Sequence, residues 1–140
     1  MLAGHTYNEG IGSDDVLLAK ISGSGAQEWI RILGESGSEY TRRIIALQDG
    51  GYLVCGYTKS FNTLYDIFLI KIDGQGSVVW QKRLGDDSVP DFCWGLAESS
   101  QDNFLYIGGA TGFSSSRNAM VAKITQNGDL VWLKLYGGVG

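Results

Sequence analysis

The stretch "FLIKIDGQGSVVWQKRLG" (Phe68–Gly85) occurs in three spellings along a chain of 140 residues. The other copies are "LLAKISGSGAQEWIRILG", which begins at Leu17, and "MVAKITQNGDLVWLKLYG", which begins at Met120. Each copy has a lysine, a glycine and a tryptophan in the same order: Lys20, Gly25 and Trp29; Lys71, Gly76 and Trp80; Lys123, Gly128 and Trp132. The lysines and the tryptophans both recur after 51 and then 52 residues, so the chain contains an internal repeat, which predicts a modular architecture.

One repeat is long enough for four short strands. In the middle repeat, apolar runs bounded by Gly, Asp, Asn and Ser predict strands at Tyr40–Gln48, Tyr52–Thr58, Asp66–Ile72 and Val78–Leu84. Hairpin sequences such as "DGG" and "DGQG" connect successive runs. Four antiparallel strands in a repeat of about fifty residues are typical of one blade of a β-propeller.

We therefore expect an all-β fold of about three four-stranded antiparallel blades, in a single propeller segment that spans residues 1–140. The repeat units are approximately residues 1–37, 38–89 and 90–140, and the first lacks its innermost strand. Propellers close at four to eight blades, so we expect an incomplete, open propeller. It is either a piece of a longer protein or a unit that self-associates through its open blade edges, and a truncated reading frame is a third alternative.

The composition suits short strands and excludes several kinds of partner. The chain has 21 glycines and one proline, which favours tight turns over long helices. A net charge of −4 leaves no concentrated basic face, so we expect no nucleic-acid partner. No apolar run is as long as a membrane span, and the start, "MLAGHTYNEG", lacks the basic flank and apolar stretch of a signal peptide.

The two cysteines, Cys55 and Cys93, form no recognisable framework in the sequence. We expect free, buried thiols, with a single bridge between them as the alternative. The redox compartment of the protein is left open by the sequence.

The recurrent glycines, tryptophans and lysines have architectural explanations. Each glycine lies in the turn before the fourth strand, where we expect a backbone angle that other residues avoid; a phosphate loop would have to lead into a helix instead. The tryptophans lie on the outermost strand, where we expect packing between blades rather than stacking on a ligand. We expect the lysines to lay their stems over apolar surface, with the ammonium groups in water or beside an acidic group of the next blade, and not to act as catalysts.

The sequence offers few residues for chemistry. His5 is the only histidine, and there is no nucleophile-elbow, C-x-x-C or calcium-loop motif. Glu39 and Asp91 occupy equivalent positions before the first strand of their units, where we expect each to cap a turn, with metal binding as the alternative. The acidic loop "GDDSVPD" (Gly85–Asp91) is a further candidate for a cation. We predict no catalytic residue, no bound metal and no cofactor.

Positions at which the repeats differ are better candidates for a binding site. Arg42 corresponds to Trp94 in the next unit, and Arg43 corresponds to Gly95. The first strand of a blade runs nearest the propeller axis, so these differences would alter the central channel or its rim. The predicted binding residues are Arg42, Arg43, Asp91 and Trp94, and neutral drift is the alternative.

The segment from Asp49 to Gly85, "DGGYLVCGYTKSFNTLYDIFLIKIDGQGSVVWQKRLG", resembles the repeat of bacterial secreted and cell-surface β-propellers of the SBBP type. In that repeat an aspartate opens an apolar strand ending in lysine and a polar turn, and Gly, Trp and a closing Gly follow. The third unit departs from it with Asn118 for the opening aspartate and Thr125 in place of Asp73. "YIGGATG" through Trp132 is more distantly similar to a kelch repeat, and the glycine–tryptophan ending to quinoprotein propellers.

The resemblance implies an extracellular or envelope-associated propeller, usually within a much larger protein, and it implies no catalytic residues. The expected function is a non-catalytic structural scaffold, or a binding module for a protein or carbohydrate ligand. The alternative is part of a propeller enzyme, a quinoprotein-like oxidoreductase or a lyase, whose active site lies in blades outside this chain.

Overall fold

The computed structural model describes residues 1–61 and 63–137, and this part of the chain contains eleven β-strands and no helix. Neighbouring strands within each sheet are antiparallel throughout. The strands are β1 (Leu2–Tyr7), β2 (Asp14–Ile21), β3 (Gln27–Leu33), β4 (Glu39–Ala46), β5 (Tyr52–Thr58), β6 (Asp66–Ile72), β7 (Val78–Leu84), β8 (Asp91–Glu98), β9 (Leu105–Thr111), β10 (Asn118–Ile124) and β11 (Leu130–Tyr136).

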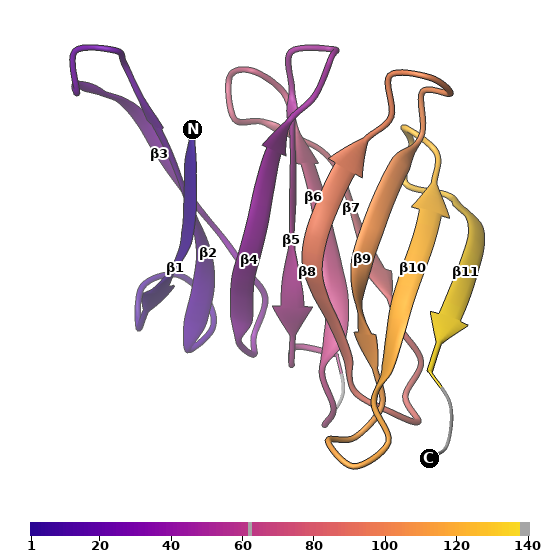
Figure 1. Ribbon diagram of the computed structural model, residues 1–140. Helices are drawn as coiled ribbons and strands as arrows, with labels where there is room; N and C mark the ends of the chain where they lie inside the picture. The colour runs from indigo at the N-terminus through magenta and orange to yellow at the C-terminus, as the bar shows by residue number, and fades with distance from the viewer. Residues whose placement is uncertain (62, 138–140) are drawn as a thin grey trace.

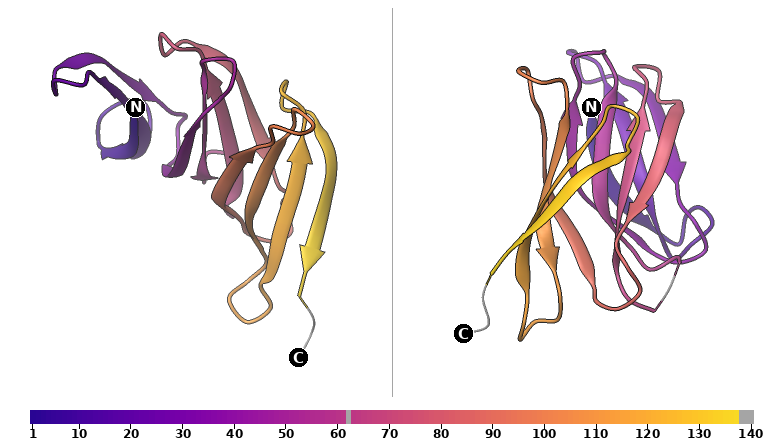
Figure 2. Two further views of the ribbon diagram at one scale, coloured as in Figure 1. Left: turned by 45° about the horizontal axis from the view of Figure 1, so that its top comes forward. Right: turned by 90° about the vertical axis from the view of Figure 1, so that its right-hand side faces the viewer.

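The strands form three sheets that follow one another along the chain (Figure 1). The first sheet has the order β1-β2-β3, the second β4-β5-β6-β7 and the third β8-β9-β10-β11. The sheets stand one beside the next in an arc (Figure 2, left). The predicted all-β class and the count of three, four and four strands are therefore confirmed, and the sheets are blade-like.

In the second sheet, β5, β6 and β7 have the predicted bounds, whereas β4 begins and ends earlier than expected. Leu47 leaves the strand because it closes the following turn. Its N–H donates to the carbonyl of Gly51 at 2.9 Å, and its carbonyl accepts from Gly50 at 3.1 Å. The last two residues of the predicted strand thus belong to the hairpin.

The second sheet is covered on both faces, and this explains why every residue of β6 is buried. One core lies between the first two sheets and the other between the last two. The first consists of Val16, Leu18, Val54, Phe68, Ile70 and Ile72. The second consists of Leu47, Leu53, Cys55, Ile67, Leu69, Cys93, Leu105, Ile107, Met120, Ala122 and Ile124.

The recurrent glycines adopt the predicted backbone conformation, with φ of +86° at Gly25, +85° at Gly76 and +81° at Gly128. The turns at Gly76 and Gly128 also receive a tryptophan from the preceding sheet. A Cβ at Gly76 would lie 2.7 Å from Trp29, and one at Gly128 would lie 3.1 Å from Trp80. Packing between sheets is therefore confirmed for Trp29 and Trp80.

The recurrent lysines pair with acidic groups differently from the prediction. Lys71 is buried and pairs with Asp49 at 2.7 Å, in its own sheet, and its Nζ also donates to the side chain of Gln126 in the next sheet at 3.1 Å. Lys123 likewise pairs with Asp102 of its own sheet at 2.7 Å. The acidic partner thus comes from the same sheet, and the next sheet supplies neutral oxygens.

The expectation of free thiols is wrong, because Cys55 and Cys93 form a disulfide. Cys55 lies on β5 and Cys93 on β8, and both are fully buried in the core between the second and third sheets. The sequence could not bring them together, because their proximity depends on the packing of two separate repeats. The bridge links these two sheets covalently.

Across residues 1–61 and 63–137, the structure has no helix with the length and apolar character required to traverse a membrane.

Candidate functional site

Two β-bulges place exposed side chains at equivalent points of the second and third sheets. Between β4 and β5 the register shifts from Thr41 to Arg43, so Arg42 is the extra residue. Between β8 and β9 it shifts from Cys93 to Gly95, so Trp94 is the extra residue. Bulges re-aim side chains and are frequent beside functional sites, and both of these residues are exposed.

A glycine on the neighbouring strand makes each bulge possible. A Cβ at Gly56 would lie 2.0 Å from the carbonyl oxygen of Tyr40, and one at Gly109 would lie 1.9 Å from that of Phe92. Only a residue without a side chain allows the backbones to approach so closely. The repeated "CG" and "GG" of the second strands are thus the sequence signal for the bulges.

Six aromatic rings form a continuous network beside the bulges, which we call the aromatic surface. Neighbouring ring centroids are 5.0 to 6.2 Å apart, within the range of favourable aromatic contacts. All three sheets or their loops contribute rings, and all six side chains are at least partly accessible to solvent. The members are His5, Tyr40, Tyr57, Tyr65, Phe92 and Trp94.

Three cations lie over the rings of the aromatic surface. The guanidinium of Arg42 is 4.9 Å from the Tyr57 centroid, and that residue also hydrogen-bonds to the Tyr57 hydroxyl. Lys59 Nζ is 4.4 Å from the ring of Tyr65. Arg117 is 4.7 Å from the ring of Phe92. These cation–π contacts hold positive charge at the surface of a chain whose net charge is −4.

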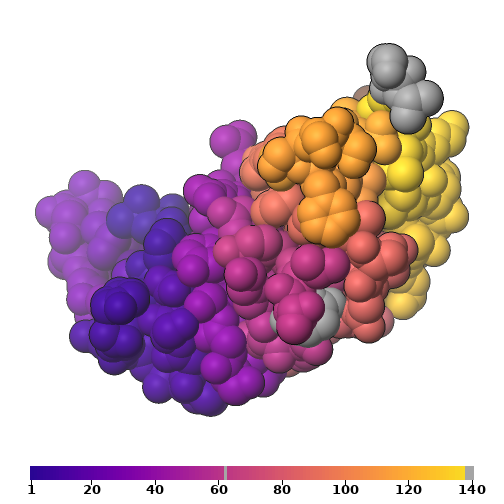
Figure 3. Space-filling model, turned by 90° about the horizontal axis from the view of Figure 1, so that it is seen from below, coloured from indigo at the N-terminus to yellow at the C-terminus, as the bar shows by residue number. Residues whose placement is uncertain are grey.

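A cavity of about 260 Å³ opens at the aromatic surface, between the loops that precede β6 and β10. Rings, positive charge and apolar groups line it: Lys59, Tyr65, Pro90, Phe92, Phe113 and Arg117. Figure 3 views the molecule from the end at which these loops lie, and there the first, second and third units form one uninterrupted surface. A ligand laid along this end can therefore contact more than one sheet.

Tyr40, at the centre of the network, keeps its phenolic proton. A hydrogen bond with Ser38 lowers its pKa, but burial and the neighbouring carboxylate of Asp14 raise it, and the net direction is upward. The ring of Tyr40 touches those of His5, Tyr57 and Tyr65. Tyr40 is thus a neutral centre that joins the first sheet to the second.

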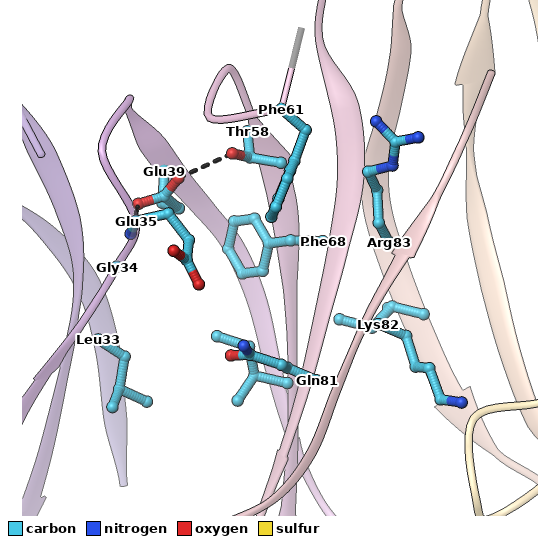
Figure 4. Close-up of a pocket in the computed structure, with 12 residues that line it drawn as sticks. Leu33, Gly34, Glu35, Glu39, Thr58, Phe61, Phe68, Gln81, Lys82 and Arg83 are labelled. Carbon is cyan, nitrogen blue, oxygen red and sulfur yellow. Dashed lines mark hydrogen bonds between the residues drawn. The ribbon is translucent and has the colours of Figure 1, made fainter. Parts of the chain in front are cut away.

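Two further cavities lie between the sheets at their outer strands. A cavity of about 270 Å³ separates the first and second sheets and is lined by Leu33, Phe68 and Arg83 among others (Figure 4). The matching cavity between the second and third sheets, of about 240 Å³, is lined by Leu84 and Met120. Because the two recur at equivalent positions, we interpret them as consequences of the packing of one sheet on the next.

Glu39 borders the first of these gaps and holds a turn, as predicted. Thr58 Oγ1 donates to Glu39 Oε1 at 2.7 Å (Figure 4), and the backbone N–H of Glu35 donates to Oε2 at 2.9 Å. Ser60 also donates its hydroxyl to the carboxylate. These partners use both oxygens of Glu39 for structure.

Asp91, the equivalent of Glu39, is buried against Gly85 rather than on the aromatic surface. Burial raises its pKa, a hydrogen bond with Thr111 lowers it, and the nearby negative charges of Asp86 and Asp66 raise it, with an upward net direction. Asp86 itself accepts hydrogen bonds from Ser88. The "GDDSVPD" loop therefore uses acidic groups to fix its own conformation.

The four predicted binding residues are divided by the structure. Arg42 and Trp94 belong to one network, connected through Tyr57 and Phe92. Arg43 is exposed on β4 beyond the bulge and makes none of the ring contacts described above, and Asp91 is buried.

Sequence reasoning missed several residues of the candidate site. They are three rings of the aromatic surface, His5, Tyr57 and Tyr65, and two of the cations that lie over it, Lys59 and Arg117. His5 and Tyr57 occupy equivalent positions of their units, as do Tyr65 and Arg117, but the residues at each pair of positions differ, so a search for identical recurring residues does not find them. Their shared signal is that aromatic and basic residues gather near the loops between second and third strands.

No metal centre is evident in the described part of the chain, where no three His, Cys, Asp or Glu side chains lie together as ligands.

No protein-family model matches the chain, and no curated protein matches it either. The aromatic surface, with its three cations and its cavity, is thus the principal candidate site.

Proposed function

We propose that the chain is a segment of a β-propeller of the bacterial secreted type and that it serves as a non-catalytic binding module. The repeat spacing, the consecutive sheets of three, four and four strands and the packing of Trp29 and Trp80 on the following sheet support the propeller. The disulfide supports an extracellular or envelope location, because such bridges persist in oxidising compartments.

The observation that carries the binding function is the aromatic surface. Tyrosine, tryptophan and arginine dominate the energetics of protein–protein interfaces, and here the three residue types are joined in one network. Trp94 is 49% exposed although it is large and apolar, and Arg117 lies 6.0 Å from its ring. An exposed aromatic residue with a guanidinium beside it is suited to a partner that brings both apolar and acidic groups.

We therefore propose a protein partner, bound through a segment with acidic and apolar side chains. Arg42, Lys59 and Arg117 would meet the carboxylates, and the cavity beside Tyr65 and Phe92 would receive an apolar side chain. A carbohydrate ligand would use the same rings by stacking, with less dependence on the cations. Removal of a positive charge should therefore weaken the binding of a protein partner more than the binding of a carbohydrate.

The test is binding to an array of acidic, neutral and basic peptides and to an array of neutral and acidic glycans. We expect binding to acidic peptides, with an affinity that falls about tenfold in Trp94→Ala and in Arg117→Ala, since an interface hot spot contributes about 1–2 kcal/mol or more. Val79→Ala is the matched control, because Val79 is 57% exposed on β7 and belongs to neither the network nor its cavity.

If the protein bound glycans and no peptides, the ligand would be a carbohydrate and the proposal of a protein partner would be wrong. Binding that neither Trp94→Ala nor Arg117→Ala weakens would refute the site. The enzymatic alternative, a quinoprotein-like oxidoreductase or lyase with its active site in other blades, makes a different prediction. A tightly bound quinone, detected by absorbance in a purified longer protein that contains this segment, would favour it.

A further inference from the structure

A contact between a tryptophan and a glycine turn joins neighbouring sheets twice within the three-sheet array. The outer face of the third sheet carries an unused tryptophan of this kind, and that of the first sheet carries an unused glycine turn. Within the array, Trp29 packs on the turn at Gly76, and Trp80 packs on the turn at Gly128. The tryptophan comes from the last strand of one sheet, and the glycine from the turn before the last strand of the next. This contact has a direction along the chain. Each sheet contributes its tryptophan to the contact with the following sheet (the forward side) and its glycine turn to the contact with the preceding sheet (the backward side).

At the two ends of the array, one half of the contact is left over. Trp132 is the forward tryptophan of the third sheet, and its described ring neighbours, Tyr106 and Lys134, belong to that same sheet. Gly25 is the backward glycine of the first sheet. A Cβ built at Gly25 meets no atom within 4 Å, whereas the equivalent positions in the other sheets are in contact with indole carbons.

Hydrogen bonds repeat across the inner contacts in the same direction. Trp80 Nε1 donates to the carbonyl of Gln126 at 3.0 Å, and Lys71 Nζ approaches that carbonyl at 3.5 Å. Lys20 Nζ approaches the carbonyl of Gly74 in the same way, at 3.5 Å. The equivalent residue of the first sheet is Gly23, which is exposed.

Both outer faces carry partly or fully exposed apolar and aromatic side chains. The outer face of the first sheet exposes Leu2 (61%), Ile30 (42%) and Ile32 (38%). The outer face of the third sheet carries Trp132 and Tyr136, and Tyr136 is 55% exposed at the position where Leu84 packs into the inner core. Figure 2 shows the two end sheets at opposite ends of the arc. Exposed apolar faces of this kind mark interaction sites.

We propose that a second copy of this chain covers these faces head-to-tail, with Trp132 of one copy on the Gly25 turn of the other. The inner contacts show that each outer face fits a sheet of the same repeat, and a second copy of this chain supplies both of the faces required. A head-to-tail interface between two copies can close into a ring, and two copies supply six sheets, within the range of four to eight at which propellers close. The association uses sheet faces rather than strand edges, and it does not depend on the proposed ligand.

The experiment is sedimentation velocity over a range of protein concentrations. We expect the wild type to form a discrete species of twice 15.2 kDa. Ala19→Lys disables the outer face of the first sheet, because Ala19 is the equivalent of the buried Ile70, and Tyr136→Lys disables that of the third. Each variant alone should be monomeric, with association weakened at least about tenfold. Val79→Lys is the control for an added charge, and circular dichroism verifies the fold of every variant.

A mixture of the two variants distinguishes the proposed geometry from other modes of association. Ala19→Lys retains an intact third-sheet face, and Tyr136→Lys retains an intact first-sheet face. The mixture should therefore form a one-to-one heterodimer through a single competent interface, although neither variant dimerises alone. A wild type that is monomeric at every concentration, open-ended growth, or a mixture that stays monomeric would overturn the proposal.

Discussion

The disulfide between Cys55 and Cys93 is expected to stabilise the array strongly. The bridge closes a loop with a sequence separation of 38 residues. In the chain-entropy model, a loop of this size removes enough freedom from the unfolded state to stabilise the fold by about 4 kcal/mol at 25 °C. At a urea m-value of about 2 kcal/mol/M, reduction should lower the unfolding midpoint by about 2 M.

The assay is equilibrium unfolding in urea, followed by tryptophan fluorescence, with and without a reducing agent. Both cysteines are fully buried, so the reduced sample must be unfolded in the presence of the reductant and then refolded before the measurement. The double variant Cys55→Ala/Cys93→Ala is the control, and its midpoint should not respond to the reductant. Two titratable thiols in the untreated protein, or equal midpoints for its oxidised and reduced forms, would refute the argument.

Four further substitutions test the packing of the sheets and one buried carboxyl group. Trp80→Ala should lower the free energy of unfolding by about 3–5 kcal/mol, measured in urea, because the indole packs between two sheets; a loss under about 1 kcal/mol would contradict this role. Gly76→Ala should cost more than Gly25→Ala by thermal unfolding, since both have positive φ but only Gly76 touches an indole, that of Trp29, and equal losses would show that this contact is unimportant. The raised pKa of Asp91 means that the folded state holds this proton more tightly than the unfolded state. Its contribution to the unfolding free energy should therefore decline as the pH rises from about 4 through the raised pKa, and Asp91→Asn should remove that decline from urea midpoints measured between pH 4 and pH 7.

The sheets could be predicted from the repeat because the same turns and strand pairings recur in every unit and require similar residues at fixed spacing. The lysine, glycine and tryptophan at fixed spacing identified the third strand, the turn and the fourth strand, and β6 and β7 have the predicted bounds. The disulfide was not predictable in this way. Its two cysteines belong to different units and occupy positions that are not equivalent, so no internal comparison relates them.

The candidate site was predictable only where the units could be compared. Arg42 and Trp94 attracted attention because equivalent positions carried unlike residues, and the structure places both at bulges. Tyr65 and Arg117 belong to loops of different sequence, and their approach to Phe92 follows from how the second and third sheets pack. Asp91 was noted because it is the equivalent of Glu39, and the structure shows that it is buried. A recurrent spacing does not distinguish a structural carboxylate from an accessible one.

The bulges separate the variable part of each unit from the part that folds it. Gly56 and Gly109 create the bulges, while the residues at the bulges, Arg42 and Trp94, contribute nothing to either core. Their side chains can therefore be exchanged with little effect on stability. A protein built in this way can acquire a new partner through a change at one position per unit, and the same two positions are natural entry points for engineering its specificity.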